Sequence, residues 1–136
     1  MTLTETARKV FADDRFATEA TGIVIDQVDN HTAQCSLKLD GRHRNARGVA
    51  MGGVLFTLAD FAAAVAANSD CLSDGNLRWV SLNSSIHFLA PVSGNSLMAT
   101  ASPLKLGRTT ALYQTIIESP DNGKRIAIVE TTMMFV

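Results

Sequence analysis

Hydrophobic residues follow a helical spacing at the start of the chain. Leu3, Ala7, Val10 and Phe11 recur on one face of a helix. The preceding Thr2 and the later Glu5 have the spacing of a capping box, which marks a helix start. The pattern predicts a short amphipathic helix that ends near Ala12.

The spacing then changes to strict alternation, which is typical of strands. Between Thr32 and Leu39 every second residue is apolar, so one face of this strand should be packed and the other wetter. A strand over 23–29 precedes it, joined by a turn at 29–31. Four further strands are expected at 77–89, 96–106, 109–118 and 125–136, and the last separator contains Asn122-Gly123, a strong hairpin signal.

The run between residues 49 and 68 follows neither spacing, because it is apolar or small almost throughout. Its length and its many alanines favour a helix, and a helix that is apolar all round should be buried. Asp60 is the one charge between Arg47 and Asp70. Hairpin-joined strands form antiparallel sheets, so we expect one helix lying across an antiparallel sheet, an α+β fold.

Composition narrows the function classes. The 136 residues predict a single domain over 1–136, and 46% hydrophobic residues suffice for a core. The low charged fraction, 18%, indicates burial in a homo-oligomer, and a net charge of -1 argues against nucleic acid as a partner. Cys35 and Cys71 make no disulfide framework, and no secretory signal opens the chain, so we expect a cytoplasmic protein. A membrane span over 49–67 is disfavoured, because Asp60 lies near its middle.

Gly52-Gly53 at the start of the long helix is the first candidate for chemistry. Glycines there leave backbone N–H groups uncovered, and such donors suit an anion or a developing oxyanion. The alternative is that they only allow close packing. Asp60 lies eight residues beyond Gly52, roughly 12 Å along a helix, so both groups can act on one carbonyl only if two subunits meet. Asp60 could instead be a hydrogen-bonded structural residue.

These residues resemble a known family. Asn45, Gly48, Gly52-Gly53, Leu58 and Asp60 look like the signature of hotdog-fold acyl-CoA thioesterases of the phenylacetic-acid-degradation (PaaI-like) type. The second half agrees, in these segments: Val80-Ser81-Leu82-Asn83, Phe88-Leu89-Ala90-Pro91, Gly94 and Gly107-Arg108. The resemblance implies a sheet wrapped around the long helix, and dimers that often pair into tetramers.

The resemblance also implies roles in hydrolysis of an acyl-CoA thioester. The Gly52 amide would polarise the thioester carbonyl, and Asp60 of the partner subunit would be base or nucleophile. Asn45 would help to place water or carbonyl, and Ser81 would assist the water. One residue departs from the family: Met51 stands where a histidine is usual, so one hydrogen-bond donor is lost.

Binding residues are expected around the same helix start. Arg42, Arg44 and Arg47 form a basic loop that could contact coenzyme A phosphates, although charged loops are usually only solvated. Gly48, Met51 and Gly53 complete the candidate substrate contacts.

Other chemistry is poorly supported. The three histidines lack metal-ligand spacing, no serine elbow or dinucleotide fingerprint appears, and no cofactor or metal is expected. Two alternatives to a thioesterase stay open: a hotdog acyl-CoA-binding or regulatory protein with little turnover, and an acyl-thioester dehydratase or hydratase. The sequence does not tell which acyl group the substrate carries or whether the protein is a dimer or a tetramer. It also does not tell whether Asp60 acts as a base or as a nucleophile.

Overall fold

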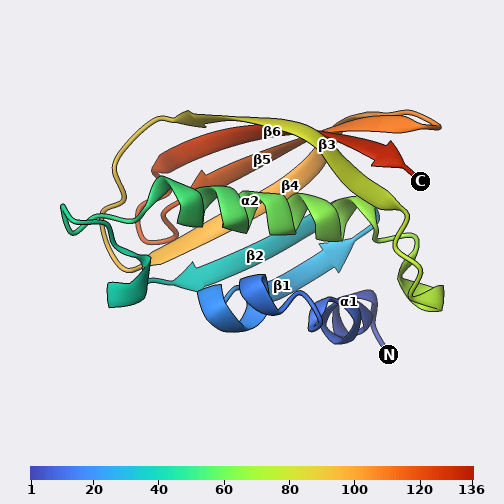
Figure 1. Ribbon diagram of the computed structural model, residues 1–136, viewed down its shortest axis with the longest axis horizontal. Coiled ribbons are helices and arrows are strands. Elements are labelled where there is room, and N and C mark those ends of the chain that lie inside the picture. The colour runs from blue at the N-terminus through green and yellow to red at the C-terminus, as the bar shows by residue number, and fades with distance from the viewer.

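The fold is a six-stranded antiparallel sheet with one long helix lying across it (Figure 1). The computed structural model describes residues 1–136. The strands follow the order β1-β2-β4-β5-β6-β3. The elements are α1 (Leu3–Phe11), η1 (Phe16–Thr21), β1 (Val24–Asp29), β2 (Thr32–Lys38), η2 (Gly41–His43), α2 (Gly52–Ala67), η3 (Leu72–Asp74), β3 (Trp79–Phe88), β4 (Ser96–Leu106), β5 (Thr110–Glu118) and β6 (Arg125–Phe135).

Small residues let α2 approach the sheet closely. Its buried face is rich in alanine, and β4 presents Ala99 and Ala101 to the same core. Leu58 of α2 is fully buried among them. Because an interior packed this tightly tolerates little displacement, the core holds α2 rigidly, together with the residues at its exposed end and on its exposed side.

The two edge strands of the sheet, β1 and β3, differ in whether another element covers their outer side. At the β1 edge, α1 satisfies the outer backbone groups: Arg8 Nε donates to the Ile25 carbonyl at 2.8 Å, and the Val28 amide donates to Thr4 Oγ1 at 2.9 Å. The β3 edge has no such cover and exposes apolar residues, with Val80 at 43% and Leu82 at 56%. An uncovered edge strand leaves a row of backbone N–H and C=O groups without partners in the sheet.

The predicted elements are confirmed, with boundaries shifted by a few residues. The Thr2 side chain caps α1 as expected, accepting from the Glu5 amide. The 122–123 turn joins β5 to β6, with Gly123 at a φ of 70°. Two features differ from expectation: the short helices η1, η2 and η3 were not predicted, and α2 is exposed along part of its surface, at Phe56 for example. No helix in the structure is both long and apolar enough to cross a membrane.

Candidate functional site

The start of α2 presents two unused backbone donors. Met51 precedes the helix with extended backbone and offers no side-chain cap, and the Gly52 and Gly53 amides donate to no group in the chain. Both glycines are exposed. Because the first amides of a helix carry its partial positive charge, this end can hold a carbonyl oxygen on which negative charge develops.

A buried histidine fixes the segment that leads into α2. His43 is 2% exposed, its Nδ1 accepts from the Asp40 amide at 2.9 Å, and its Nε2 lies 2.7 Å from the Thr21 carbonyl. Since the amide can only donate and the carbonyl can only accept, the proton is on Nε2. The His43 carbonyl in turn accepts from the Met51 amide at 2.9 Å. His43 is therefore a structural residue that positions the start of the helix.

Asn45 shapes the loop beside the helix start. Its Oδ1 accepts from the Arg47 amide at 2.9 Å and the Val49 amide at 3.3 Å, while Gly48 takes a φ of 82°. The amide nitrogen of the side chain has no partner in the chain and is left as the free end. Asn45 thus has one end in the turn and one N–H donor group available.

The three arginines of the basic loop are not equivalent. Arg42 donates to the Ala20 carbonyl at 2.8 Å and pairs with Asp40 at 3.2 Å. Arg44 donates to Asn95 Oδ1 at 2.9 Å. The exposed Arg47 side chain makes no hydrogen bond or ion pair, so it is the guanidinium of the three that is free to meet an anion.

The carboxylate of Asp60 is half-buried on α2 and is held by β3. Ser81 Oγ donates to Asp60 Oδ1 at 3.2 Å, and it also lies 3.7 Å from Met133 Sδ. The β3–β6 register shifts between Ser81 and Asn83, a β-bulge of the kind that re-aims side chains beside functional sites. Two residues predicted from the sequence are therefore in contact, although they are far apart in the chain.

A cavity of about 340 Å³ opens beside Asp60 and brings in residues that the sequence did not indicate. Asp14, Phe16 and Thr57 share its lining. Burial raises the pKa of the Asp14 carboxyl, and the nearby Asp60 and Asp13 charges raise it further. From the sequence, Thr57 could be placed near Asp60 only because it lies about one helical turn before it. Asp14 and Phe16 lie in a segment without clear periodicity, so the sequence did not indicate that they are close to Asp60.

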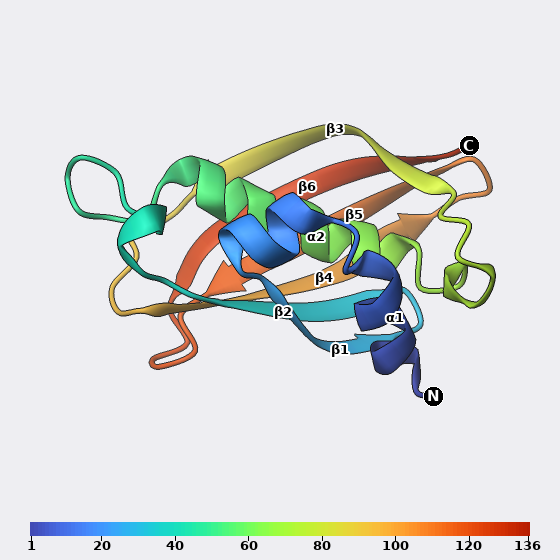
Figure 2. The same cartoon turned by 60° about the horizontal axis from the view of Figure 1, so that its bottom comes forward.

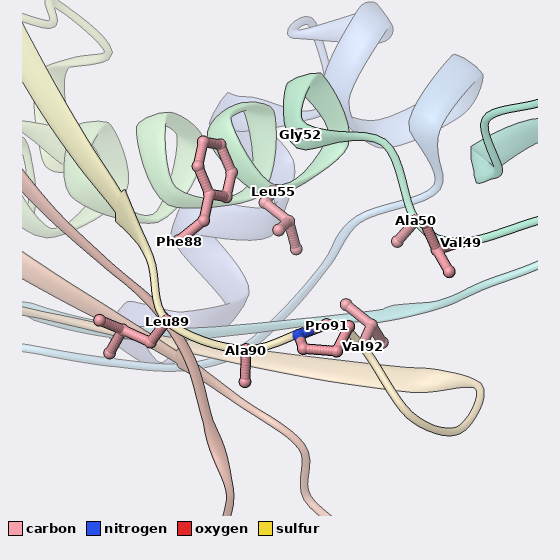
Figure 3. A pocket seen from close by; sticks show the side chains of 9 residues that line it. All are labelled: Val49, Ala50, Gly52, Leu55, Phe88, Leu89, Ala90, Pro91 and Val92. Carbon is pink, nitrogen blue, oxygen red and sulfur yellow. The ribbon is translucent and has the colours of Figure 1, made fainter. Parts of the chain in front are cut away.

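A second, apolar cavity of about 310 Å³ lies at the Gly52 end of α2 (Figure 3). Seven of its nine lining residues are hydrophobic. The lining comes from the loop before α2, from α2, from the last residue of β3 and from the loop after β3: Val49, Ala50, Gly52, Leu55, Phe88, Leu89, Ala90, Pro91 and Val92. The Phe88 ring lies against the helix start, so that a Cβ at Gly52 would stand 3.1 Å from Phe88 Cζ. This hollow places apolar surface directly beside the free amide.

The geometry within one chain separates the two chemical groups. Gly52 and Asp60 lie on the same helix, roughly two turns and 12 Å apart. A single carbonyl cannot reach both in one subunit.

The remaining nucleophile and metal candidates are poor. Burial, assisted by the Asp26 charge, raises the pKa of the Cys35 thiol to about 12. Burial also raises the pKa of Cys71, and its thiol donates to Asp70 at 3.3 Å. A thiol that stays protonated is a weak nucleophile. His31 Nδ1 lies 3.2 Å from the Tyr113 hydroxyl, and no three His, Cys, Asp or Glu residues gather as metal ligands.

Known proteins are similar to this chain in sequence and in fold. The model of the family described as "Thioesterase superfamily" matches residues 47–126. The acyl-coenzyme A thioesterase PaaI of Escherichia coli is 33% identical over 110 residues, covering 80% of this chain and 74% of that protein. A putative esterase of Deinococcus radiodurans is 29% identical over 122 residues, covering 90% of this chain and 80% of the relative.

Solved structures of thioesterases have a fold similar to that of this chain. The E. coli PaaI structure superposes with a TM-score of 0.84 at 27% identity, covering 99% of this chain and 96% of the other. A Haemophilus influenzae thioesterase gives a TM-score of 0.85 at 26% identity, covering 100% of this chain and 91% of the other.

Proposed function

This chain belongs to the Thioesterase superfamily, and we propose that it hydrolyses acyl-CoA at a site shared by two subunits. It has the hotdog fold, is PaaI-like, and is a thioester hydrolase. The observation that supports the proposal is that α2 carries both a backbone amide at Gly52 with no partner in the chain and a carboxylate at Asp60 that accepts a hydrogen bond from Ser81.

Sharing between subunits follows from the distance between these groups. The uncovered β3 edge, with Val80 and Leu82 exposed, supports pairing of two copies edge to edge. A two-fold axis across that edge makes the contact self-complementary and creates two equal sites. In each site the Gly52 amide of one subunit faces Asp60 of the other.

The chemistry then needs only groups that this chain supplies. The Gly52 amide donates to the carbonyl oxygen and stabilises the negative charge of the tetrahedral intermediate. Asp60 takes a proton from water, whose oxygen attacks the carbonyl carbon; the C–S bond breaks, and the proton passes to the departing thiolate. In the second route the Asp60 carboxylate attacks the carbonyl carbon and the C–S bond breaks, which expels CoA as its thiolate. Water then hydrolyses the resulting anhydride, which restores the Asp60 carboxylate and supplies the proton that the thiolate takes. Both routes yield a free acid and CoA.

Binding of the CoA portion is assigned to the Gly52 end. The unpaired Arg47 guanidinium supports a contact with phosphate, whereas Arg42 and Arg44 are engaged within the chain. The apolar cavity beside Gly52 suits the uncharged arm that leads to the sulfur. Asn45 offers its side-chain N–H donors, and Gly48 and Gly53 keep the backbone around the substrate free of side chains.

Met51 favours one alternative. It stands at the position before Gly52, and its side chain offers no N–H or O–H donor. Loss of one oxyanion donor can cost about 2.7–4 kcal/mol, so a binding or regulatory protein with little turnover is the second candidate. A dehydratase would need an acid-base histidine at the helix start, and Met51 does not supply one.

A panel of acyl-CoAs with thiol detection tests the proposal. We expect thiol release by the wild type and a loss of at least about tenfold in kcat for Asp60→Asn. Asp26→Asn, an exposed carboxylate on β1, is the matched control and should leave kcat unchanged. Saturable acyl-CoA binding without thiol release would favour the binding protein, and loss of enoyl-CoA absorbance would favour the hydratase.

A further inference from the structure

Phe16 is an exposed aromatic ring on a firmly held backbone. Phe16 is 70% exposed, the highest value for any aromatic residue in the chain. Its element, η1, lies over α2 (Figure 2). The backbone there is anchored, because the Gly22 and Ile23 amides donate to the Ala17 carbonyl at 3.1 and 2.9 Å. Arg42 and His43 hold the end of η1 through the Ala20 and Thr21 carbonyls.

Two cavities meet at this residue. One, of about 340 Å³, contains Asp60, and the other, of about 380 Å³, contains Met51, Gly53 and Val54. Phe16 and Thr57 line both. The two cavities therefore lie along the same side of α2 and are adjacent at Phe16 and Thr57, the residues that they share.

This arrangement gives the cavities one fitting occupant. A substrate carbonyl at Asp60 has its CoA portion directed to the partner's Gly52 end in the proposed function, so the acyl portion must leave by the other side. The groove between η1 and α2 begins at Asp60. Four of the eight residues that line its first part are hydrophobic, and the lining consists of Asp14, Arg15, Phe16, Ala17, Thr57, Asp60, Phe61 and Ala64. An acyl chain lying there would meet the Phe16 ring before reaching Val54.

We propose that Phe16 sets the acyl-chain length that the enzyme accepts, by closing the groove between the two cavities. The inference rests on the proposed function. Short acyl groups end in the first cavity, and longer ones must displace the ring. Removing the ring joins the cavities and lets added methylene groups be buried along α2.

The experiment compares kcat/KM for butyryl-CoA and decanoyl-CoA in the wild type, Phe16→Ala and Phe16→Trp. Each newly buried methylene contributes up to about fourfold in kcat/KM, so Phe16→Ala should raise the decanoyl-to-butyryl ratio at least about tenfold. Phe16→Trp should lower it. Phe56→Ala removes an exposed ring of α2 that lines neither cavity, and should leave the ratio unchanged.

The outcomes separate the two proposals. A ratio in Phe16→Ala equal to that of the wild type, or an equal loss with both substrates, overturns the role of Phe16 while leaving thioester hydrolysis intact. Absence of thiol release from every acyl-CoA by the wild type overturns the proposed function itself. A thermal melt of each variant verifies folding, and little change is expected because the ring is exposed.

Discussion

Replacing Gly52 by proline would remove the proposed oxyanion donor and add a Cβ that the Gly52→Ala control shares. Gly52 is the first residue of α2, a position where proline is well tolerated because the amide there has no partner within the helix. The preceding Met51 has φ -65° and ψ 142°, the extended conformation that a residue before proline requires. We therefore expect Gly52→Pro to fold and to assemble like the wild type.

The size of the effect follows from what the amide does. Losing one oxyanion donor costs about 10²–10³ in kcat. Gly52→Ala keeps the amide proton and serves as the steric control. Its Cβ would stand 3.1 Å from Phe88 Cζ, so the ring or helix start must move by a few tenths of an ångström. If 1 Å of misplacement costs about 10²-fold, this shift costs roughly three- to tenfold.

Thiol release under saturating acyl-CoA measures both variants, with thermal melts beside them. The reasoning predicts that kcat falls in the order wild type, Gly52→Ala, Gly52→Pro, with about tenfold or more between the two variants. Equal kcat for the alanine and proline variants, both folded, would show that the Gly52 amide is not the donor.

Three further predictions concern side chains around the site. Ser81→Ala should lower kcat roughly fivefold, because it removes the hydrogen bond that orients Asp60; Ser84→Ala on the same strand is the control and should retain wild-type kcat. Arg47→Ala should raise KM for acyl-CoA at least about threefold at low salt, with a smaller change at high salt, since its charge is unpaired and exposed; unchanged KM would remove it from phosphate binding. Burial raises the pKa of Asp14, so the folded chain binds this proton more tightly than the unfolded chain, and stability falls as pH rises through the raised pKa. Asp14→Asn should therefore raise Tm at pH 7 but not below about pH 4; an equal shift at both pH values would contradict this.

The sheet and α2 could be predicted because their patterns are local. Alternation along β2 and the Asn122-Gly123 turn each specify a conformation without help from distant residues. Contacts between residues that are far apart in the sequence could not be predicted in this way. In the sequence His43 is an isolated histidine with no pattern around it. Its structural role depends on Thr21, whose carbonyl the fold places beside His43 Nε2. The same holds for Phe16, whose place beside α2 is decided by tertiary packing.

Some residues of the candidate site could be predicted from the sequence, and others could not. Gly52, Asp60 and Ser81 were predicted, and the structure brings Ser81 onto Asp60 through the β3 bulge. Asp14 could not be predicted as their neighbour, because it follows α1 in a segment where no spacing indicates which way a side chain faces. The arginines were indistinguishable in sequence; their partners in the fold leave Arg47 free.

Subunit complementation tests the shared site most directly. Coexpression of Gly52→Pro with Asp60→Asn yields mixed dimers in which one site has both defects and the other has neither. With random pairing, about a quarter of wild-type activity should return, although each variant alone is nearly inactive. Activity that stays at the level of the single variants, in preparations where mixed dimers are demonstrated, would mean that the amide and the carboxylate do not act together across subunits.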